Sequence, residues 1–202
     1  MDFDGLKSKL GPPGARWVCV FGTSDPSDQQ SVAEAEELGY ALAKNGYVVV
    51  TGGYGAAMEA ANRGAHNAGG FTVGVTCSAF SRQPNRYLDQ NIETHSLLER
   101  LETLLKLGDG YVAAKGGTGT LAEIALAWEY INKRIVPPRP LVLLGKFWEA
   151  LPGIIRDEKA APGVSIGRAG NSITTARDVA EAVGIITRSF ASSAGKYSES
   201  SK

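Results

Sequence analysis

The chain has 202 residues, of which 43% are hydrophobic and 21% charged, as is typical of a globular protein with one buried core. Lys plus Arg and Asp plus Glu each total 21, so the charge gives no indication of a nucleic acid, an anionic membrane or another polyanion as partner. No apolar signal-peptide core and no run of roughly 20 apolar residues is present, and we expect a cytoplasmic protein.

Five apolar runs rich in β-branched and aromatic residues predict the strands of one sheet. Helical patterns separate them, which is typical of βαβ units. The runs are apolar throughout, as in parallel strands that helices cover on both faces. We therefore predict a single α/β domain with a Rossmann-like, doubly wound parallel sheet and a ligand at the carboxyl ends of its strands. The predicted strands are Trp17–Phe21, Tyr47–Thr51, Phe71–Thr76, Tyr111–Ala114 and Leu141–Leu144.

The predicted helices each have an apolar stripe with a start or stop signal. They are Ser31–Lys44, Ser96–Leu107, Thr120–Lys133, Phe147–Asp157 and a last helix after Thr175. In the second of these, Leu97, Leu98, Leu101, Leu104 and Leu105 form the stripe, and Arg100 lies about 100° from its centre. The third is expected to bury Leu121, Ile124, Ala125 and Trp128.

The domain is expected to span residues 16–190. Residues 1–15 are predicted to be a flexible N-terminal segment, and residues 191–202, which are small and polar, a disordered tail. A glycine-rich loop from Ala160 to Ser172 is expected to cover or border the site.

Cysteines and histidines give no indication of a metal site. Cys19 and Cys77 fall within or at the end of apolar strand-like runs and are predicted to be reduced core thiols. His66 and His95 have no Asp, Ser or Cys at catalytic spacing, and two histidines are too few for a His-based site. We expect neither a metal nor another cofactor.

Three strands lead into glycine loops that would open on the same edge of the sheet. Glycines let backbone N–H groups approach an anion, and a following helix directs its positive end at the same place. One such loop could be a simple strand-to-helix turn, but three on one edge predict a phosphate or nucleotide site. Neither Gly-x-Gly-x-x-Gly nor Gly-Lys-Ser/Thr is present, which excludes the common NAD and P-loop motifs. The predicted binding residues are Gly22, Thr23, Ser24, Gly52, Gly53, Gly55, Met58, Gly116, Gly117, Thr118, Gly119 and Thr120.

Two of these loops resemble a known family. Lys115-Gly-Gly-Thr-Gly-Thr-Leu-Ala-Glu123 is similar to the Pro-Gly-Gly-x-Gly-Thr-x-x-Glu signature of the LOG family, phosphoribohydrolases long labelled as lysine decarboxylases. Gly52-Gly-Tyr-Gly-Ala-Ala-Met-Glu-Ala-Ala61 resembles the glycine-rich stretch after the second strand of that family. Nothing in the chain marks the Schiff-base lysine that a pyridoxal decarboxylase needs.

The resemblance implies an activity and a pair of catalytic residues. Family members cleave the N-glycosidic bond of a nucleoside 5'-monophosphate to free base and ribose 5-phosphate, and the resemblance also implies a homodimer. It assigns catalysis to Glu123 and to Arg100 on the preceding helix. A carboxylate can stabilise the positive charge that develops on the ribose and orient the attacking water. An arginine can clamp the nucleotide or hold the carboxylate in position.

Other interpretations of these residues remain open at this point. Thr120-x-x-Glu123 is also a capping-box pattern, and Arg100 could be a solvated or salt-bridged edge residue. Lys115 could be a solvated strand end or add charge near the phosphate. The chain departs from the family pattern at Lys115, Tyr54 and Leu101. These departures favour an alternative, a non-catalytic nucleotide or molybdenum-cofactor carrier, and a scaffold domain with a vestigial pocket is the third hypothesis.

Overall fold

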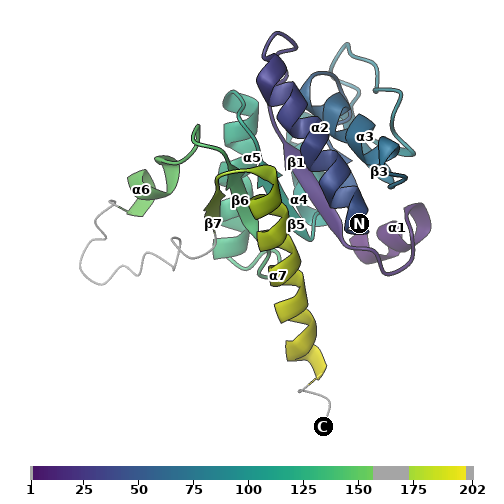
Figure 1. Cartoon of the computed structure of the whole chain (residues 1–202). Coiled ribbons are helices and arrows are strands. Elements are labelled where there is room, and N and C mark those ends of the chain that lie inside the picture. Colours follow the sequence, from purple (N-terminus) through teal and green to yellow (C-terminus); the bar gives the residue numbers. More distant parts are fainter. Residues whose placement is uncertain (1, 157–172, 199–202) are drawn as a thin grey trace.

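The computed structural model describes residues 2–156 and 173–198, and within them one sheet of 7 parallel strands forms the centre of the molecule (Figure 1). The strand order is β4-β3-β2-β1-β5-β6-β7. Because β1 lies between β2 and β5, the order reverses there, and the loops after β1 and β5 diverge at this switch point. The strands are β1 Trp17–Phe21, β2 Val48–Thr51, β3 Thr72–Cys77, β4 Gln90–Thr94, β5 Gly110–Ala113, β6 Leu141–Leu144 and β7 Ile173–Ala176.

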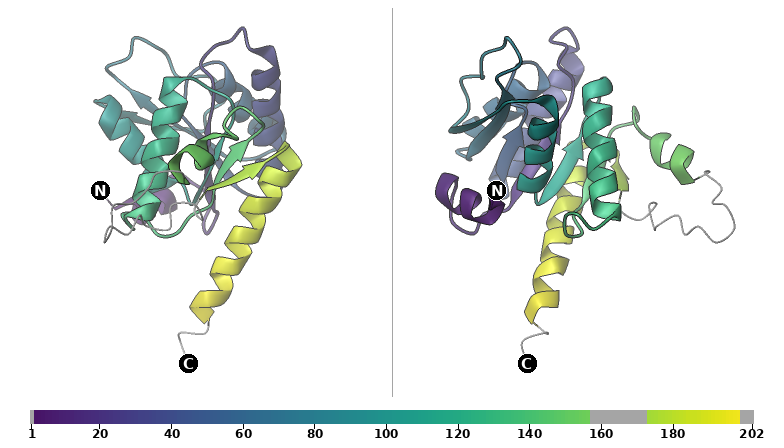
Figure 2. Two further views of the ribbon diagram at one scale, coloured as in Figure 1. Left: turned by 90° about the vertical axis from the view of Figure 1, so that its left-hand side faces the viewer. Right: turned by 180° about the vertical axis from the view of Figure 1, so that it is seen from behind.

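Helices cover both faces of the sheet, which confirms the predicted doubly wound α/β fold (Figures 1 and 2). Alternate side chains of β1 serve the two faces: Trp17, Cys19 and Phe21 pack on one, Val18 and Val20 on the other. On the first face lie α1 Phe3–Leu10, α4 Leu97–Leu107 and α5 Thr118–Asn132; on the second lie α2 Gln29–Lys44, α3 Ala57–Asn67 and α7 Val179–Ser198. None of the helices in the described residues is both long and apolar enough to cross a bilayer.

The sequence analysis did not find the two edge strands. Most side chains of β4 are exposed, and the middle of β7 is exposed as well, so neither has the apolar run that marks a buried parallel strand. Polar side chains hold β4 in place instead. The Asp89 carboxylate accepts a hydrogen bond from the Thr72 amide at 2.8 Å, and the side chains of Thr76 and Asn91 pair across the two strands.

Helices α2 and α3 pack very closely through glycine. A Cβ added to Gly39 would lie 1.9 Å from the carbonyl oxygen of Ala61, and one added to Gly64 would lie 2.0 Å from that of Glu36. Buried alanines fill the rest of this contact. The Arg63 guanidinium and the Glu36 carboxylate form a two-bond ion pair at its margin. The two helices are therefore held at a separation that only glycine permits at these positions.

Both chain ends differ from the expectation. Residues 3–10 form α1 where a flexible segment was expected, because Phe3, Leu6 and Leu10 pack against the core and Lys7 pairs with Asp109 at 2.8 Å. Helix α7 continues to Ser198, into the predicted tail. Helix α6, described over Leu151–Arg156, begins later than the predicted start at Phe147. The loop predicted from Ala160 to Ser172 lies outside the described residues.

Several apolar residues of α4 and α5 face outward, contrary to the prediction. Leu97 is 50% exposed, Leu98 74% and Leu121 38%, and Ala125 is exposed too. On α4 the buried face is instead turned to include Arg100, which is only 7% exposed. The reason is a set of hydrogen-bond acceptors on β3 and after β2, described below, that the helical pattern alone does not show.

The two cysteines are free and buried, which confirms the prediction of core thiols. The Cys19 thiol donates a hydrogen bond to the Leu104 carbonyl at 3.2 Å. Burial raises the pKa of this thiol far above its usual range, so it is an unreactive core group.

Candidate active site

A cavity of about 290 Å³ lies at the carboxyl edge of the sheet, beside the switch point. It is bounded by the loops after β1, β2, β3 and β5 and by the beginnings of α4 and α5. Its lining residues are Gly22, Ser24, Tyr54, Met58, Phe80, Arg82, Leu97, Arg100, Gly117, Thr118, Gly119, Thr120 and Glu123. Both predicted catalytic residues thus line one cavity together with seven of the predicted binding residues.

The N-terminus of α5 forms one wall of this cavity. The helix begins at Thr118, and Leu121 donates to the Gly117 carbonyl at 3.0 Å. The amides of the first turn before Leu121 have no acceptor within the helix, and the helix dipole adds positive potential there. Among the described residues, no atom outside the local backbone lies within 4 Å of a Cβ position on Gly117 or Gly119, so the start of the helix is not covered at these positions. The geometry suits an anionic group.

The helix start excludes the capping-box interpretation. Gly117 is the N-cap of α5, so Thr120 is already the third helical residue and cannot cap. Its hydroxyl donates to the Gly22 carbonyl at 3.0 Å and thereby joins the loops after β1 and β5. Glu123, one turn further on, contacts Arg100 instead of the helix start.

Arg100 and Glu123 form a buried pair in the cavity wall. The Arg100 Nε donates to the Val75 carbonyl at 2.8 Å, and its Nη2 donates to the Gly52 carbonyl at 3.1 Å. The Nη1 lies 3.9 Å from Glu123 Oε1. Both residues are less than 10% exposed, so Arg100 is not a solvated edge residue, whereas its ion pair with Glu123 agrees with the salt-bridged alternative. The carbonyl contacts fix the guanidinium beneath Glu123, a position suited to holding the carboxylate.

Burial changes the acidity of Glu123. It raises the pKa of the carboxyl from 4.5 to about 7, although the charge of Arg100 acts in the opposite direction. Near neutral pH the carboxyl is therefore present in both protonation states. Such a group can accept or donate a proton during a reaction, as a general acid or base must.

This pKa shift predicts a pH-dependent difference in stability between the native chain and Glu123→Gln. Folding favours the protonated carboxyl, so its contribution is fully present below pH 4.5 and is lost as the pH rises through about 7. We expect the unfolding free energy of the native chain to fall by about 3 kcal/mol relative to the variant across this window. Urea unfolding at a series of pH values measures the difference, and parallel pH profiles would contradict the assigned shift.

Two glycines of the second loop, Gly52 and Gly53, do not line the cavity, and Gly52 instead makes room for Arg100. A Cβ on Gly52 would lie 1.8 Å from Arg100 Nη2, so the guanidinium occupies the space that a side chain would need. Gly53 has φ of +77°, and its amide donates to the Thr51 hydroxyl at 3.0 Å. Three further predicted binding residues, Thr23, Gly55 and Gly116, are also absent from the lining. The sequence analysis therefore did not distinguish the residues that line the cavity from those that lie behind its lining.

Tyr54 was seen in the sequence only as a departure from the family pattern. It is 3% exposed, its hydroxyl accepts from the Cys77 amide at 2.8 Å, and it donates to the Cys77 carbonyl at 3.1 Å. Its ring lies 5.6 Å from the Arg100 guanidinium and 6.1 Å from the Phe80 ring. Tyr54 thus connects the second loop, the end of β3 and Arg100.

Three other lining residues were not predicted, namely Phe80, Arg82 and Leu97. Phe80 and Arg82 belong to the connection after β3. Because this connection follows a predicted parallel strand, its position at the carboxyl edge of the sheet could have indicated that it reaches the site. Lys115, in contrast, is absent from the lining. Its ammonium pairs with Asp28 at 2.8 Å, and this contact is the main cause of the lowered pKa of the Asp28 carboxyl. This position favours a structural role for Lys115 over a contact with the ligand.

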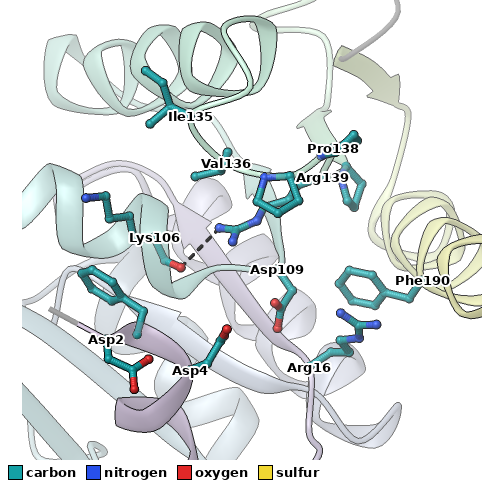
Figure 3. A pocket seen from close by; sticks show the side chains of 13 residues that line it. Asp2, Asp4, Arg16, Lys106, Asp109, Ile135, Val136, Pro138, Arg139 and Phe190 are labelled. Carbon is teal, nitrogen blue, oxygen red and sulfur yellow. Dashed lines mark hydrogen bonds between the residues drawn. The ribbon is translucent and has the colours of Figure 1, made fainter. Parts of the chain in front are cut away.

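A larger cavity, of about 660 Å³, lies at the opposite edge, where the strands begin (Figure 3). Its charged groups are engaged in holding the fold. The Arg139 guanidinium donates to the carbonyls of Leu105, Lys106 and Gly108 at the end of α4, as Figure 3 shows for Lys106. Asp109 pairs with Lys7 and accepts from the Trp17 amide at 2.8 Å. The helix N-terminus that reaches this cavity is that of α1, where the Asp2 carboxylate already accepts from the Gly5 amide at 3.0 Å, and none of the described lining residues is a glycine.

In the described part of the chain, no three His, Cys, Asp or Glu residues are grouped so that they could hold a metal ion. The described residues that line the smaller cavity supply backbone amides, hydroxyl groups, the guanidinium groups of Arg82 and Arg100 and the carboxyl group of Glu123.

A parallel sheet with a cavity at its switch point defines a Rossmann-like protein of the class that binds small molecules at strand ends. The chain belongs to the SLOG cluster4 family, whose sequence model matches residues 15–149. A cytokinin riboside 5'-monophosphate phosphoribohydrolase of Mycobacterium tuberculosis is 30% identical over 126 residues, which cover 61% of this chain and 67% of that protein. The family resemblance predicted from the glycine loops is thus confirmed.

Solved structures share the fold over almost their whole length. The molybdenum cofactor binding protein of Rippkaea orientalis matches with a TM-score of 0.72 at 23% identity, covering 89% of this chain and 99% of that one. The molybdenum cofactor carrier protein of Chlamydomonas reinhardtii matches with a TM-score of 0.71 at 26% identity, covering 88% and 99%.

Proposed function

We propose that this chain hydrolyses the N-glycosidic bond of a nucleoside 5'-monophosphate and releases the free base and ribose 5-phosphate. The observation that carries the proposal is the buried Arg100–Glu123 pair in one cavity with the open N-terminus of α5. Relatives about 30% identical are named phosphoribohydrolases, which supports the same reaction here.

The residues suit the steps of this reaction. The amides of Thr118, Gly119 and Thr120 would bind the 5'-phosphate and fix the ribose beside Glu123. As the C1'–N bond breaks, its electrons leave with the base and positive charge develops on the ribose. The Glu123 carboxylate would stabilise this charge and take a proton from the water that attacks C1'. The proton then passes to the departing base, so the products balance.

The proposal extends to Arg100 as a positioning group. Its guanidinium already donates to two carbonyls, which leaves Nη1 to face Glu123 and makes a direct clamp on the phosphate the less suitable role. No metal or other cofactor is required for these steps. A nucleotide substrate and two free buried cysteines suit a cytoplasmic protein.

We further propose a homodimer formed through α4 and α5. These helices pack side by side (Figure 2), and both expose apolar residues next to the cavity, with Leu98 74% exposed and Leu121 38%. Leu97 is 50% exposed and lines the cavity itself, so a second copy on this face would close the site. Light scattering should give twice the monomer mass, and Leu98→Arg should give the monomer mass. A monomeric native chain would contradict this proposal.

The second candidate is a carrier of a phosphate-bearing cofactor without hydrolysis. The observation in its favour is the match to the two molybdenum cofactor proteins over 99% of their length. The same α5 amides would hold the phosphate group in this case.

One experiment separates the two functions. The pure protein is incubated with AMP, GMP, IMP, CMP and UMP, and free base is followed by chromatography. Release of base with ribose 5-phosphate supports the hydrolase. If no base appears and molybdopterin, but no nucleotide, raises the melting temperature, the hydrolase proposal fails in favour of the carrier.

A further inference from the structure

Arg82 is a cation of the cavity that has no assigned role. Among the described residues, Arg82 and Arg100 are the two cations that line it. Arg100 is buried and already engaged by two carbonyls, whereas Arg82 is exposed. The Arg82 amide donates to the Phe80 carbonyl at 2.7 Å, but its guanidinium has no hydrogen bond or ion pair with any described residue. Its donors are therefore available to a ligand.

Arg82 and the N-terminus of α5 reach the cavity from different strands of the sheet. Arg82 follows β3, whereas α5 follows β5, and these strands are three positions apart in the sheet, which corresponds to about 14 Å. A series of side-chain contacts connects α5 with the loop after β3: Glu123 faces Arg100, Arg100 lies over the Tyr54 ring, and Tyr54 packs against Phe80. With a phosphate at α5 and the ribose at Glu123, the base would lie at the Phe80–Arg82 end.

We propose that Arg82 selects the base and that the substrates are 6-oxopurine nucleotides, an inference that rests on the hydrolase function proposed above. A guanidinium carries only hydrogen-bond donors. Guanine and hypoxanthine present two adjacent acceptors, N7 and O6, which match its planar fork. Adenine presents N7 beside the N6 amino group, a donor that faces the guanidinium unfavourably. Phe80 and Leu97 add apolar surface for the ring.

The test measures binding so that it does not depend on turnover. Calorimetric titrations of GMP, IMP and AMP are made with Glu123→Gln, in which hydrolysis is expected to be at least about 100-fold slower, with and without changes at Arg82. We expect GMP and IMP to bind at least about 10-fold more tightly than AMP. Arg82→Ala should remove this preference, and Arg82→Gln should favour AMP because a carboxamide pairs with the N6–N7 edge of adenine.

Arg86→Ala is the matched control. It removes the same charge from the same loop, but the Arg86 guanidinium lies 4.9 Å from the Tyr87 ring, donates to the Tyr87 hydroxyl and does not line the cavity. The preference should survive this change. Equal affinities for GMP and AMP, no binding of any nucleotide, or a preference that persists in Arg82→Ala would overturn the proposal. Absence of base release by the native chain would instead reject the hydrolase function while the binding preference is still measured.

Discussion

Glu123→Gln should lower kcat for base release by about 100- to 10,000-fold and change KM little. The amide keeps the size of the side chain and can still contact Arg100, but it can neither carry the negative charge that stabilises the ribosyl cation nor accept a proton from water. The proposed phosphate-binding amides belong to the first turn of α5 and are unchanged in this variant, which is why ground-state binding should persist. Steady-state kinetics on the preferred monophosphate measure both constants.

Lys115→Ala is the control for this prediction. Lys115 is in the signature loop, but it pairs with Asp28 and does not line the cavity, so kcat should stay within about 2-fold of the native value. Retention of native turnover by Glu123→Gln would show that the carboxyl takes no part in the chemistry. A rise in KM with kcat unchanged would mean that Glu123 contributes only to substrate binding.

The sequence predicted the central sheet because buried parallel strands need continuous apolar runs. β1 and β6 agree with their predicted bounds, whereas β4 and β7, at the two edges, carry exposed polar residues and were not found. A run of apolar residues marks a strand only where helices cover the strand and bury its side chains. Edge strands are stabilised by backbone pairing on one side and by local contacts such as Asp89 to Thr72, which composition does not show.

The position of Arg100 shows why the candidate site could be predicted only in part. The family resemblance indicated Arg100 and Glu123, and in the structure Arg100 Nη1 lies 3.9 Å from Glu123 Oε1. The helical pattern, however, put Arg100 at the edge of the apolar stripe. What buries it are acceptors from other elements, the carbonyls of Val75 and Gly52, and the ring of Tyr54. Such partners are distant in sequence and become neighbours only in the fold.

Glycines that look alike in the sequence have different roles in the structure. Gly117 and Gly119 leave open space over the α5 amides, whereas Gly52 makes room for the Arg100 guanidinium. Gly39 was not singled out at all, because a glycine within a helix looks like a tolerated weakness of that helix. The role of Gly39 depends on its contact with α3, which the sequence pattern of α2 alone does not show.

Gly39→Ala should therefore destabilise the protein by about 3 kcal/mol, even though alanine is the better helix former by about 1 kcal/mol. The new Cβ would lie 1.9 Å from the Ala61 carbonyl oxygen, and the neighbouring atom is backbone, which cannot rotate away as a side chain could. Helices α2 and α3 must then move apart, and the buried alanines between them lose contact. Urea unfolding monitored by circular dichroism measures the loss.

Gly153→Ala makes the same chemical change in a helix that has room for it. In the part of the chain that the structure describes, no atom outside the local backbone lies within 4 Å of the Cβ position on Gly153 in α6, so this variant should gain up to about 1 kcal/mol from helix propensity alone. The two substitutions are thus expected to have opposite signs. If Gly39→Ala also stabilises the chain, the close contact between α2 and α3 does not exist in solution, because only that contact can reverse the preference of a helix for alanine.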